Sequence, residues 1–103
     1  MRATTNKLTP FYPIHPGEIL KDKIEYRGIS QRKLAAQTGI SYTLLNEMLN
    51  SKRPVTTEYA LLFEAALDMD ADTFVRMQAR YNMQKARKAK RLAQVRKIAA
   101  AVL

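Results

Sequence analysis

Residues 30–50, SQRKLAAQTGISYTLLNEMLN, predict two short helices joined by a tight turn. Apolar residues recur at helical spacing on both sides of Gly39, which can adopt the positive φ that ends a helix. Ser30 and Ser41 are each suited to cap a helix, because a serine oxygen accepts a hydrogen bond from an unpaired N–H of the first turn. The stretch is therefore a helix-turn-helix, in which the small Ala35 permits the two helices to cross closely.

The apolar spacing of the second helix separates its inner face from its outer face. Leu45, Met48 and Leu49 are expected to point inward. The residues then left facing outward near the start of this helix are Ser41, Tyr42, Thr43, Asn46 and Glu47. In DNA-binding proteins with this motif, that end of the helix enters the major groove. The alternative interpretation is an α-helical hairpin whose small residues serve packing alone.

The loop that follows, residues 50–54 with the sequence NSKRP, carries two cations. Lys52 and Arg53 stand just beyond a helix expected to lie in a groove, where they can reach phosphates and fix the docking register. The alternative is a solvated loop with two ordinary surface charges.

The composition suits a small helical protein. The 103 residues are enough for one domain with a modest core. Glycine and proline are sparse, and the alternation of β-branched and aromatic residues that is typical of strands is absent, so we predict an all-α fold. The absence of cysteine excludes disulfides and thiolate metal sites. No signal-peptide region and no run of about 18 apolar residues occurs, so we expect a cytoplasmic protein that does not cross a membrane.

No set of residues in the sequence is typical of an enzyme. His15 is the only histidine, and no Cys, Asp or Glu stands near it at the spacing of metal ligands, so we interpret it as structural or solvated. Paired carboxylates in an evident cleft and a glycine-rich phosphate loop are also missing. We therefore predict no catalytic residue, no metal site and no cofactor.

The charge is concentrated at one end of the chain. Residues 1–75 hold nine basic and nine acidic residues, so the whole formal charge of +9 lies in residues 76–103. Such a cluster favours a polyanionic partner, with nucleic acid first and an anionic membrane surface a distant second. From Lys85 the sequence is a basic, alanine-rich helix former with apolar residues at helical spacing. A solvated extension, a dimer or partner contact, an added DNA contact and a membrane-surface helix remain alternatives for it.

The prediction divides the chain into three parts. Residues 1–14 form an irregular arm that Phe11 and Tyr12 partly order, residues 15–82 form the helix-turn-helix domain, and residues 83–103 form a basic helical extension. Inside the domain, one helix begins at residues 16–18 and ends at Gly28, another begins at Thr56 or Thr57, and a last one begins at Asp70 or Asp72.

Three stretches of the sequence resemble the HigA family of antitoxins, which are repressor-like, XRE-type helix-turn-helix proteins. They are HPGEIL at residues 15–20, the motif continued through LNSKRPVT at 49–56, and FVRMQARYN at 74–82. The resemblance covers about residues 13–88. It implies a compact five-helix domain that dimerises, binds palindromic operator DNA in its own promoter and represses its operon. It also implies a partner, a HigB-like ribonuclease toxin of the RelE type, which the antitoxin neutralises by direct binding.

The resemblance also assigns roles to single residues. It implies that Ser41, Tyr42, Thr43 and Asn46 read bases, that Gln31 contacts the DNA backbone or a base edge, and that Arg32, Lys52 and Arg53 contact phosphates. The family usually has Asn-Gly where this chain has Asn50-Ser51, so we expect a strained or altered turn there.

Two further questions are left open by the sequence. The apolar stripe of Phe74, Met77 and Tyr81 extends beyond a complete small bundle, and we therefore predict that it forms the interface of a homodimer. A stand-alone helix-turn-helix transcriptional regulator without a toxin partner is the alternative to the antitoxin.

Overall fold

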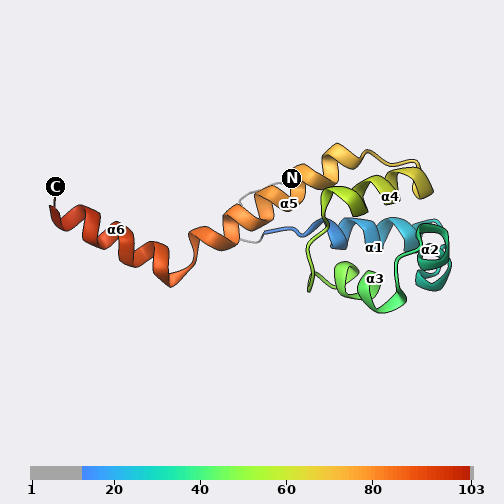
Figure 1. Ribbon diagram of the computed structural model, residues 1–103, viewed down its shortest axis with the longest axis horizontal. Coiled ribbons are helices and arrows are strands. Elements are labelled where there is room, and N and C mark those ends of the chain that lie inside the picture. Colours follow the sequence, from blue (N-terminus) through green and yellow to red (C-terminus); the bar gives the residue numbers. More distant parts are fainter. Residues whose placement is uncertain (1–12, 103) are drawn as a thin grey trace, which may run out of the picture. The chain divides into compact units, whose positions relative to one another are not determined.

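The computed structural model describes residues 13–102, and this part of the chain is helical (Figure 1). Its elements are α1 (Pro16–Tyr26), α2 (Gln31–Thr38), α3 (Tyr42–Leu49), α4 (Thr57–Leu67), α5 (Ala71–Arg87) and α6 (Lys90–Val102). Since none of the described residues lies in a strand, the predicted all-α class is confirmed. Most of the predicted N-terminal arm, with Phe11 and Tyr12, lies outside the described residues.

The chain divides into two compact units, and the division falls inside α5. One unit is Ile14–Gln78, which contains α1 to α4 and the first part of α5. The described residues 79–102 belong to the other unit, with the rest of α5 and all of α6. The predicted boundaries at residues 14 and 82, and a five-helix domain with a separate basic extension, therefore stay predictions.

Side-chain caps fix where four of the helices begin. Ser30, Ser41 and Thr56 accept hydrogen bonds from the N–H groups of the residues three positions later, at 3.1, 3.2 and 3.3 Å. At α1, Nδ1 of His15 accepts from Gly17 N at 2.9 Å, while Oε2 of Glu18 accepts from His15 N at 3.3 Å. His15 is 1% exposed, so its role here is structural. Each such cap stabilises its helix by about 1 kcal/mol.

Every helix of the unit Ile14–Gln78 contributes to one core. Within this unit α1 packs against α3, and α2 packs against both α3 and α4 (Figure 1). The largest fully buried side chains come from α1 to α4 and the cap of α1; they are His15, Pro16, Leu20, Ile24, Leu34, Leu45, Met48, Leu49 and Phe63. From α5, Ala71 and Phe74 are also buried. Burial of each aliphatic or aromatic side chain stabilises the fold by about 1.5–3 kcal/mol.

The contact between α1 and α3 depends on a glycine. Gly17 lies in the first turn of α1 against the end of α3, and a Cβ atom there would collide with the carbonyl oxygen of Met48. Because the obstacle is backbone, no side-chain rotation relieves it. Gly17 thereby sets how closely the two helices approach.

The C-terminal segment is built differently. The helix that begins at Ala71 ends at Arg87, where the N–H groups of Lys88 and Ala89 bond the carbonyls of Lys85 and Ala86 in tight i to i−3 turns. A new helix, α6, then begins at Lys90, and none of its residues is buried. The predicted basic helix is thus divided in two.

Candidate nucleic-acid interface

The turn between α2 and α3 has the geometry that the sequence predicted. Gly39 has φ 78°, and its N–H donates to the Ala35 carbonyl at 2.9 Å, which closes α2. Ser41 then caps α3 from an extended backbone conformation. A residue with a Cβ atom would cost about 1–2 kcal/mol at the left-handed position. The closed end of α2 and the Ser41 cap therefore together fix the position of the exposed first turn of α3.

The two faces of α3 separate as expected. Leu45, Met48 and Leu49 are at most 1% exposed and form part of the core. On the other side, Ser41, Tyr42 and Thr43 are exposed, while Asn46 and Glu47 are partly exposed. A short polar surface with one aromatic ring is thus held at the start of this helix, which is the part that enters the major groove in proteins with this motif.

A chain of amides links the two helices of the motif. Nδ2 of Asn46 on α3 donates to Oε1 of Gln31 on α2 at 2.9 Å. Behind it, Nδ2 of Asn50 donates to the backbone oxygen of Asn46 at 2.9 Å and to its Oδ1 at 3.3 Å. Both ends of the Asn46 amide are therefore oriented in the absence of DNA, which lowers the entropy that must be lost on binding.

A second pair of side chains also joins α2 to α3. The guanidinium carbon of Arg32 lies 5.3 Å from the centroid of the Tyr42 ring, which is the geometry of a cation–π contact. Tyr42 remains 45% exposed. The contact places a positive charge and an aromatic ring together beside the amide pair, so phosphate and base contacts can come from adjacent groups.

The loop after α3 contains the strain that the sequence suggested. Ser51 has φ 63°, a left-handed conformation that glycine adopts at little cost. The turn is closed by backbone hydrogen bonds from Ser51 N to Met48 O at 3.2 Å and from Lys52 N to Glu47 O at 2.8 Å. The expectation of a strained turn at Asn50-Ser51 is therefore confirmed.

The two cations of this loop differ in their surroundings. Nε of Arg53 lies 2.9 Å from Oε1 of Glu47, and both side chains are partly exposed. Lys52 is exposed, and its backbone rather than its ammonium group ties it to the loop. Because an exposed ion pair contributes little to stability, Glu47 can release Arg53 to a phosphate at small cost.

Gln78 supports this loop, a role that the sequence analysis did not assign to it. Its side chain is 7% exposed, and its Oε1 accepts a hydrogen bond from Val55 N at 2.8 Å. Gln78 belongs to α5, whereas Val55 follows directly on the loop with Lys52 and Arg53. This bond fixes the loop to α5. A polar residue in the middle of an apolar stripe was the only available signal.

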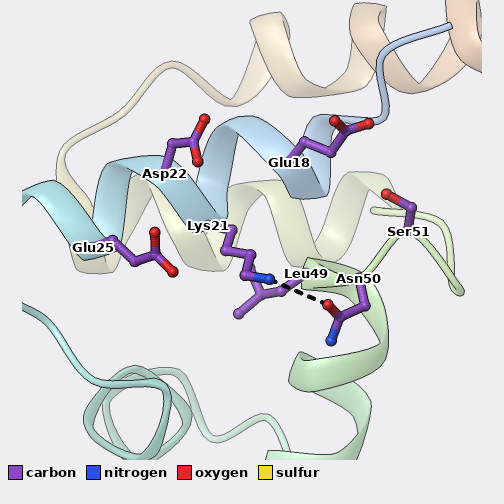
Figure 2. Close-up of a pocket in the computed structure, with 7 residues that line it drawn as sticks. All are labelled: Glu18, Lys21, Asp22, Glu25, Leu49, Asn50 and Ser51. Carbon is purple, nitrogen blue, oxygen red and sulfur yellow. Dashed lines mark hydrogen bonds between the residues drawn. The ribbon is translucent and has the colours of Figure 1, made fainter. Parts of the chain in front are cut away.

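An open pocket of about 440 Å³ lies between α1 and the end of α3 (Figure 2). Glu18, Asp22 and Glu25 line it from α1, and Leu49, Asn50 and Ser51 line it from the end of α3 and the turn after it. Figure 2 shows Lys21 reaching across, with its Nζ donating to Oδ1 of Asn50 at 3.4 Å. The three carboxylates repel phosphate, so DNA is not expected at this side of α3.

The three residues predicted to form a dimer interface are not equivalent. Phe74 is 3% exposed, and its ring packs edge-on against Phe63 with 6.4 Å between centroids, so it belongs to the core of its own chain. Little of the Phe74 side chain is therefore left to contact a second copy, and a helical apolar stripe does not distinguish an internal partner from an external one. Met77 and Tyr81 are partly exposed, and their place in an interface stays a prediction.

Among residues 13–102, no group of three or more His, Cys, Asp or Glu side chains is arranged to hold a metal ion. In the same range, no helix combines the length and apolar character needed to cross a bilayer.

Comparisons with known proteins agree with this geometry. A family model described as helix-turn-helix matches residues 20–74, more than half of the chain. Virulence-associated protein I of Dichelobacter nodosus is 32% identical over 74 residues, which are 71% of this chain and 68% of that protein.

Solved structures are similar over a larger part of the chain. An addiction module antidote protein of the HigA family from Coxiella burnetii superposes with a TM-score of 0.73 and 28% identity, over 82% of this chain and 92% of its own. The Pseudomonas aeruginosa antitoxin HigA, solved with the higBA promoter, gives a TM-score of 0.72 and 27% identity, over 84% of this chain and 91% of its own.

Proposed function

This chain belongs to the helix-turn-helix family, and on that premise we propose that it is a HigA-like antitoxin that binds operator DNA and represses its own operon. The observation that carries the proposal is the exposed start of α3, where the Asn46 amide is held by Gln31 beside the Arg32–Tyr42 contact. This arrangement supports base recognition, because the polar atoms are oriented before DNA arrives. The similarity to an antitoxin solved with its promoter supports it independently.

We assign base recognition to the first turns of α3. An asparagine amide pairs with the edge of adenine through two hydrogen bonds, which suits Asn46, and the ring of Tyr42 can pack on a thymine methyl group. Ser41 and Thr43 have hydroxyls that bond to bases or phosphates. Gln31 orients Asn46 and contacts the backbone or a base edge. This set would fix the sequence that is recognised.

Cations around this surface would set the position of the protein on the duplex. Arg32 stands at the start of α2, and Lys52 and Arg53 stand in the loop after α3. Such contacts with phosphates strengthen binding to any sequence and fix orientation without reading bases. They flank the motif in the chain, with Arg32 near its beginning and Lys52 and Arg53 just after its end, which supports a helix inserted between two phosphate backbones.

A homodimer would account for a palindromic operator. Two copies of α3, held about 34 Å apart, enter successive major grooves on one side of the duplex. We propose that Met77 and Tyr81 on α5 contribute to the contact between copies. Because Gln78 lies between these positions and bonds Val55, the same helix would hold both the partner and the phosphate-binding loop.

Binding to the chain's own promoter tests the repressor. We expect the promoter duplex to bind about a thousandfold more tightly than a scrambled duplex of equal length at physiological salt, with two chains per duplex. The readout is fluorescence anisotropy for affinity and sedimentation for stoichiometry. Equal affinities for the two duplexes would show that this chain is not a sequence-specific repressor.

The toxin partner needs a separate test. We propose that a HigB-like ribonuclease encoded beside this chain binds it directly and loses activity, in the cytoplasm where both act. Coexpression should yield a stable complex and restore growth that the toxin alone arrests. If no neighbouring product binds while operator binding persists, the chain is a stand-alone transcriptional regulator.

A further inference from the structure

The unit Ile14–Gln78 and the segment that follows it in the chain differ sharply in charge. Residues 14–78 hold eight basic and nine acidic residues, whereas residues 79–103 hold eight basic residues and no acidic side chain. No carboxylate side chain within the second segment can neutralise its cations. Four of them, Lys90, Arg91, Arg96 and Lys97, lie on α6 and are exposed.

The cations of α6 are spread around the helix. At 3.6 residues per turn, Lys90 and Lys97 project in nearly the same direction, while Arg91 and Arg96 project about 140° apart. The helix is about 20 Å long, from its residue count and the rise per residue. No single polar face carries the charge, so a partner with a dense, extended negative surface would neutralise it best.

We propose that α6 is a second DNA-binding element, which contacts phosphates beside the operator without reading sequence. The inference rests on the proposed function, since it takes the DNA to be the duplex that α3 binds. Duplex DNA carries one negative charge for about every 1.7 Å of its axis, so a stretch as long as α6 carries about twelve charges, which is more than enough for its four cations.

Other partners fit this helix less well. In a pair of α6 helices from two copies, like charges would approach each other with no acidic side chain to offset them. The apolar side of α6 consists of Leu92, Val95, Ile98 and Val102, with alanines elsewhere and no aromatic residue. Helices that lie in a membrane interface use Trp, Phe and Leu on that side.

The salt dependence of binding measures such contacts. Each phosphate neutralised adds about 0.9 to the slope of log K against log salt concentration. Lys90, Arg96 and Lys97 project within about 120° of one another, so three contacts from one α6 add about three to the slope per chain. This contribution should be the same on operator and scrambled DNA, because phosphates are common to both.

The test uses the full chain with Lys90, Arg91, Arg96 and Lys97 all replaced by Gln. Gln keeps helix propensity close to that of Lys and Arg, so charge is the main change. Affinity for the promoter and scrambled duplexes is measured between about 50 and 200 mM salt. We expect the slope to fall by about three per chain on both duplexes, with the ratio of the two affinities unchanged.

A matched control keeps the charge and changes the residues. In it Lys90 and Lys97 become Arg while Arg91 and Arg96 become Lys, and we expect the parental slope. An unchanged slope in the four-Gln variant would overturn the proposal. If the four-Gln variant sediments as a monomer while its DNA affinity is unchanged, α6 contacts a second copy and the proposal is overturned. If the four-Gln variant no longer binds phosphatidylserine vesicles while its DNA affinity is unchanged, α6 binds membranes and the proposal is likewise overturned.

Failure of the repressor and failure of the role of α6 give different results in these measurements. If the parent binds promoter and scrambled DNA alike, the repressor fails, yet a smaller slope for the four-Gln variant on both duplexes still supports α6 as a phosphate-binding helix. If the parent prefers its promoter and the slope does not change, the repressor stands and the role of α6 falls.

Discussion

The unit Ile14–Gln78 and the helix α6 place their side chains in opposite ways. In the first, apolar side chains from α1 to α5 are buried against one another, and positive and negative charges nearly balance. In α6 no residue is buried, and every charged residue is a cation. Packing holds atoms within the tolerance of a hydrogen bond, whereas exposed charge on a solvated helix attracts any phosphate.

This difference assigns base recognition to the unit Ile14–Gln78 and sequence-independent affinity to α6. Base recognition needs fixed geometry, and the Gln31–Asn46 bond at 2.9 Å is fixed by two packed helices. Sequence-independent affinity needs only charge near the duplex. Variants that disturb packing in the unit Ile14–Gln78 should therefore change stability and base recognition. Variants that remove charge from α6 should change the salt dependence of DNA binding.

The largest expected effect is at Gly17. Replacement by Ala should destabilise the fold by about 3 kcal/mol, because the added Cβ atom meets the Met48 carbonyl and the helices must separate. Urea unfolding followed by circular dichroism measures this change. Gly28→Ala is the matched control, since open space surrounds it and only its φ of 71° resists a side chain, at about 1–2 kcal/mol. A Gly17 variant no less stable than the control would refute the close contact.

The next effect is at Gln78. Replacement by Leu removes the acceptor of the Val55 N–H inside the core, and an unsatisfied buried donor costs about 1–3 kcal/mol. The same variant should weaken binding to promoter and scrambled DNA, because the loop with Lys52 and Arg53 loses its support. The exposed neighbour Arg76→Gln should change stability by less than about 0.5 kcal/mol. Wild-type stability in Gln78→Leu would contradict the proposed link between the loop and α5.

A smaller change in stability is expected at Ser51, and there the substitution should stabilise the fold. Its φ of 63° is strained for serine, so Ser51→Gly should raise the free energy of unfolding by about 0.5–1 kcal/mol after the added freedom of the unfolded chain is counted. Ser41→Gly provides the contrast, because there the hydroxyl caps α3 and its loss should lower stability by a few tenths of a kcal/mol. Destabilisation at Ser51 would mean that its side chain has a role beyond the turn.

The smallest effect on stability is expected in α6. Replacing its four cations by Gln should leave the free energy of unfolding within about 0.5 kcal/mol of the parent, because these residues are exposed and the helix buries nothing. A marked loss of stability in urea would show that the charged side chains of α6 contribute to the packing of the fold.

Much of the fold could be predicted from local sequence. Ser30, Gly39 and Ser41 act within a few residues of themselves, and helical spacing was enough to identify Leu45, Met48 and Leu49 as buried. The close approach at Gly17 could not be predicted, because it depends on a carbonyl of another helix. The burial of Phe74 could not be predicted for the same reason, since its partner Phe63 lies on a different helix.

The residues of the candidate site could be predicted from the sequence, but the contacts among them could not. The sequence and the family resemblance indicated the candidate residues between Gln31 and Arg53, which lie on α2, on α3 and in the loop after α3. They did not indicate the hydrogen bond between Gln31 and Asn46, the Arg32–Tyr42 contact or the support of the loop by Gln78. These contacts join residues that are distant in sequence, so helical periodicity carries no information about them. Contact with DNA itself stays a prediction for every one of these residues.

The central claim, that the start of α3 reads sequence, is tested most directly by Asn46→Ala. The measurement is the ratio of affinities for the promoter duplex and a scrambled duplex, with Lys52→Ala as the matched control. We expect Asn46→Ala to cost about 1–3 kcal/mol on the promoter and little on the scrambled duplex, while Lys52→Ala weakens both alike. Equal losses on the two duplexes for Asn46→Ala would contradict the claim.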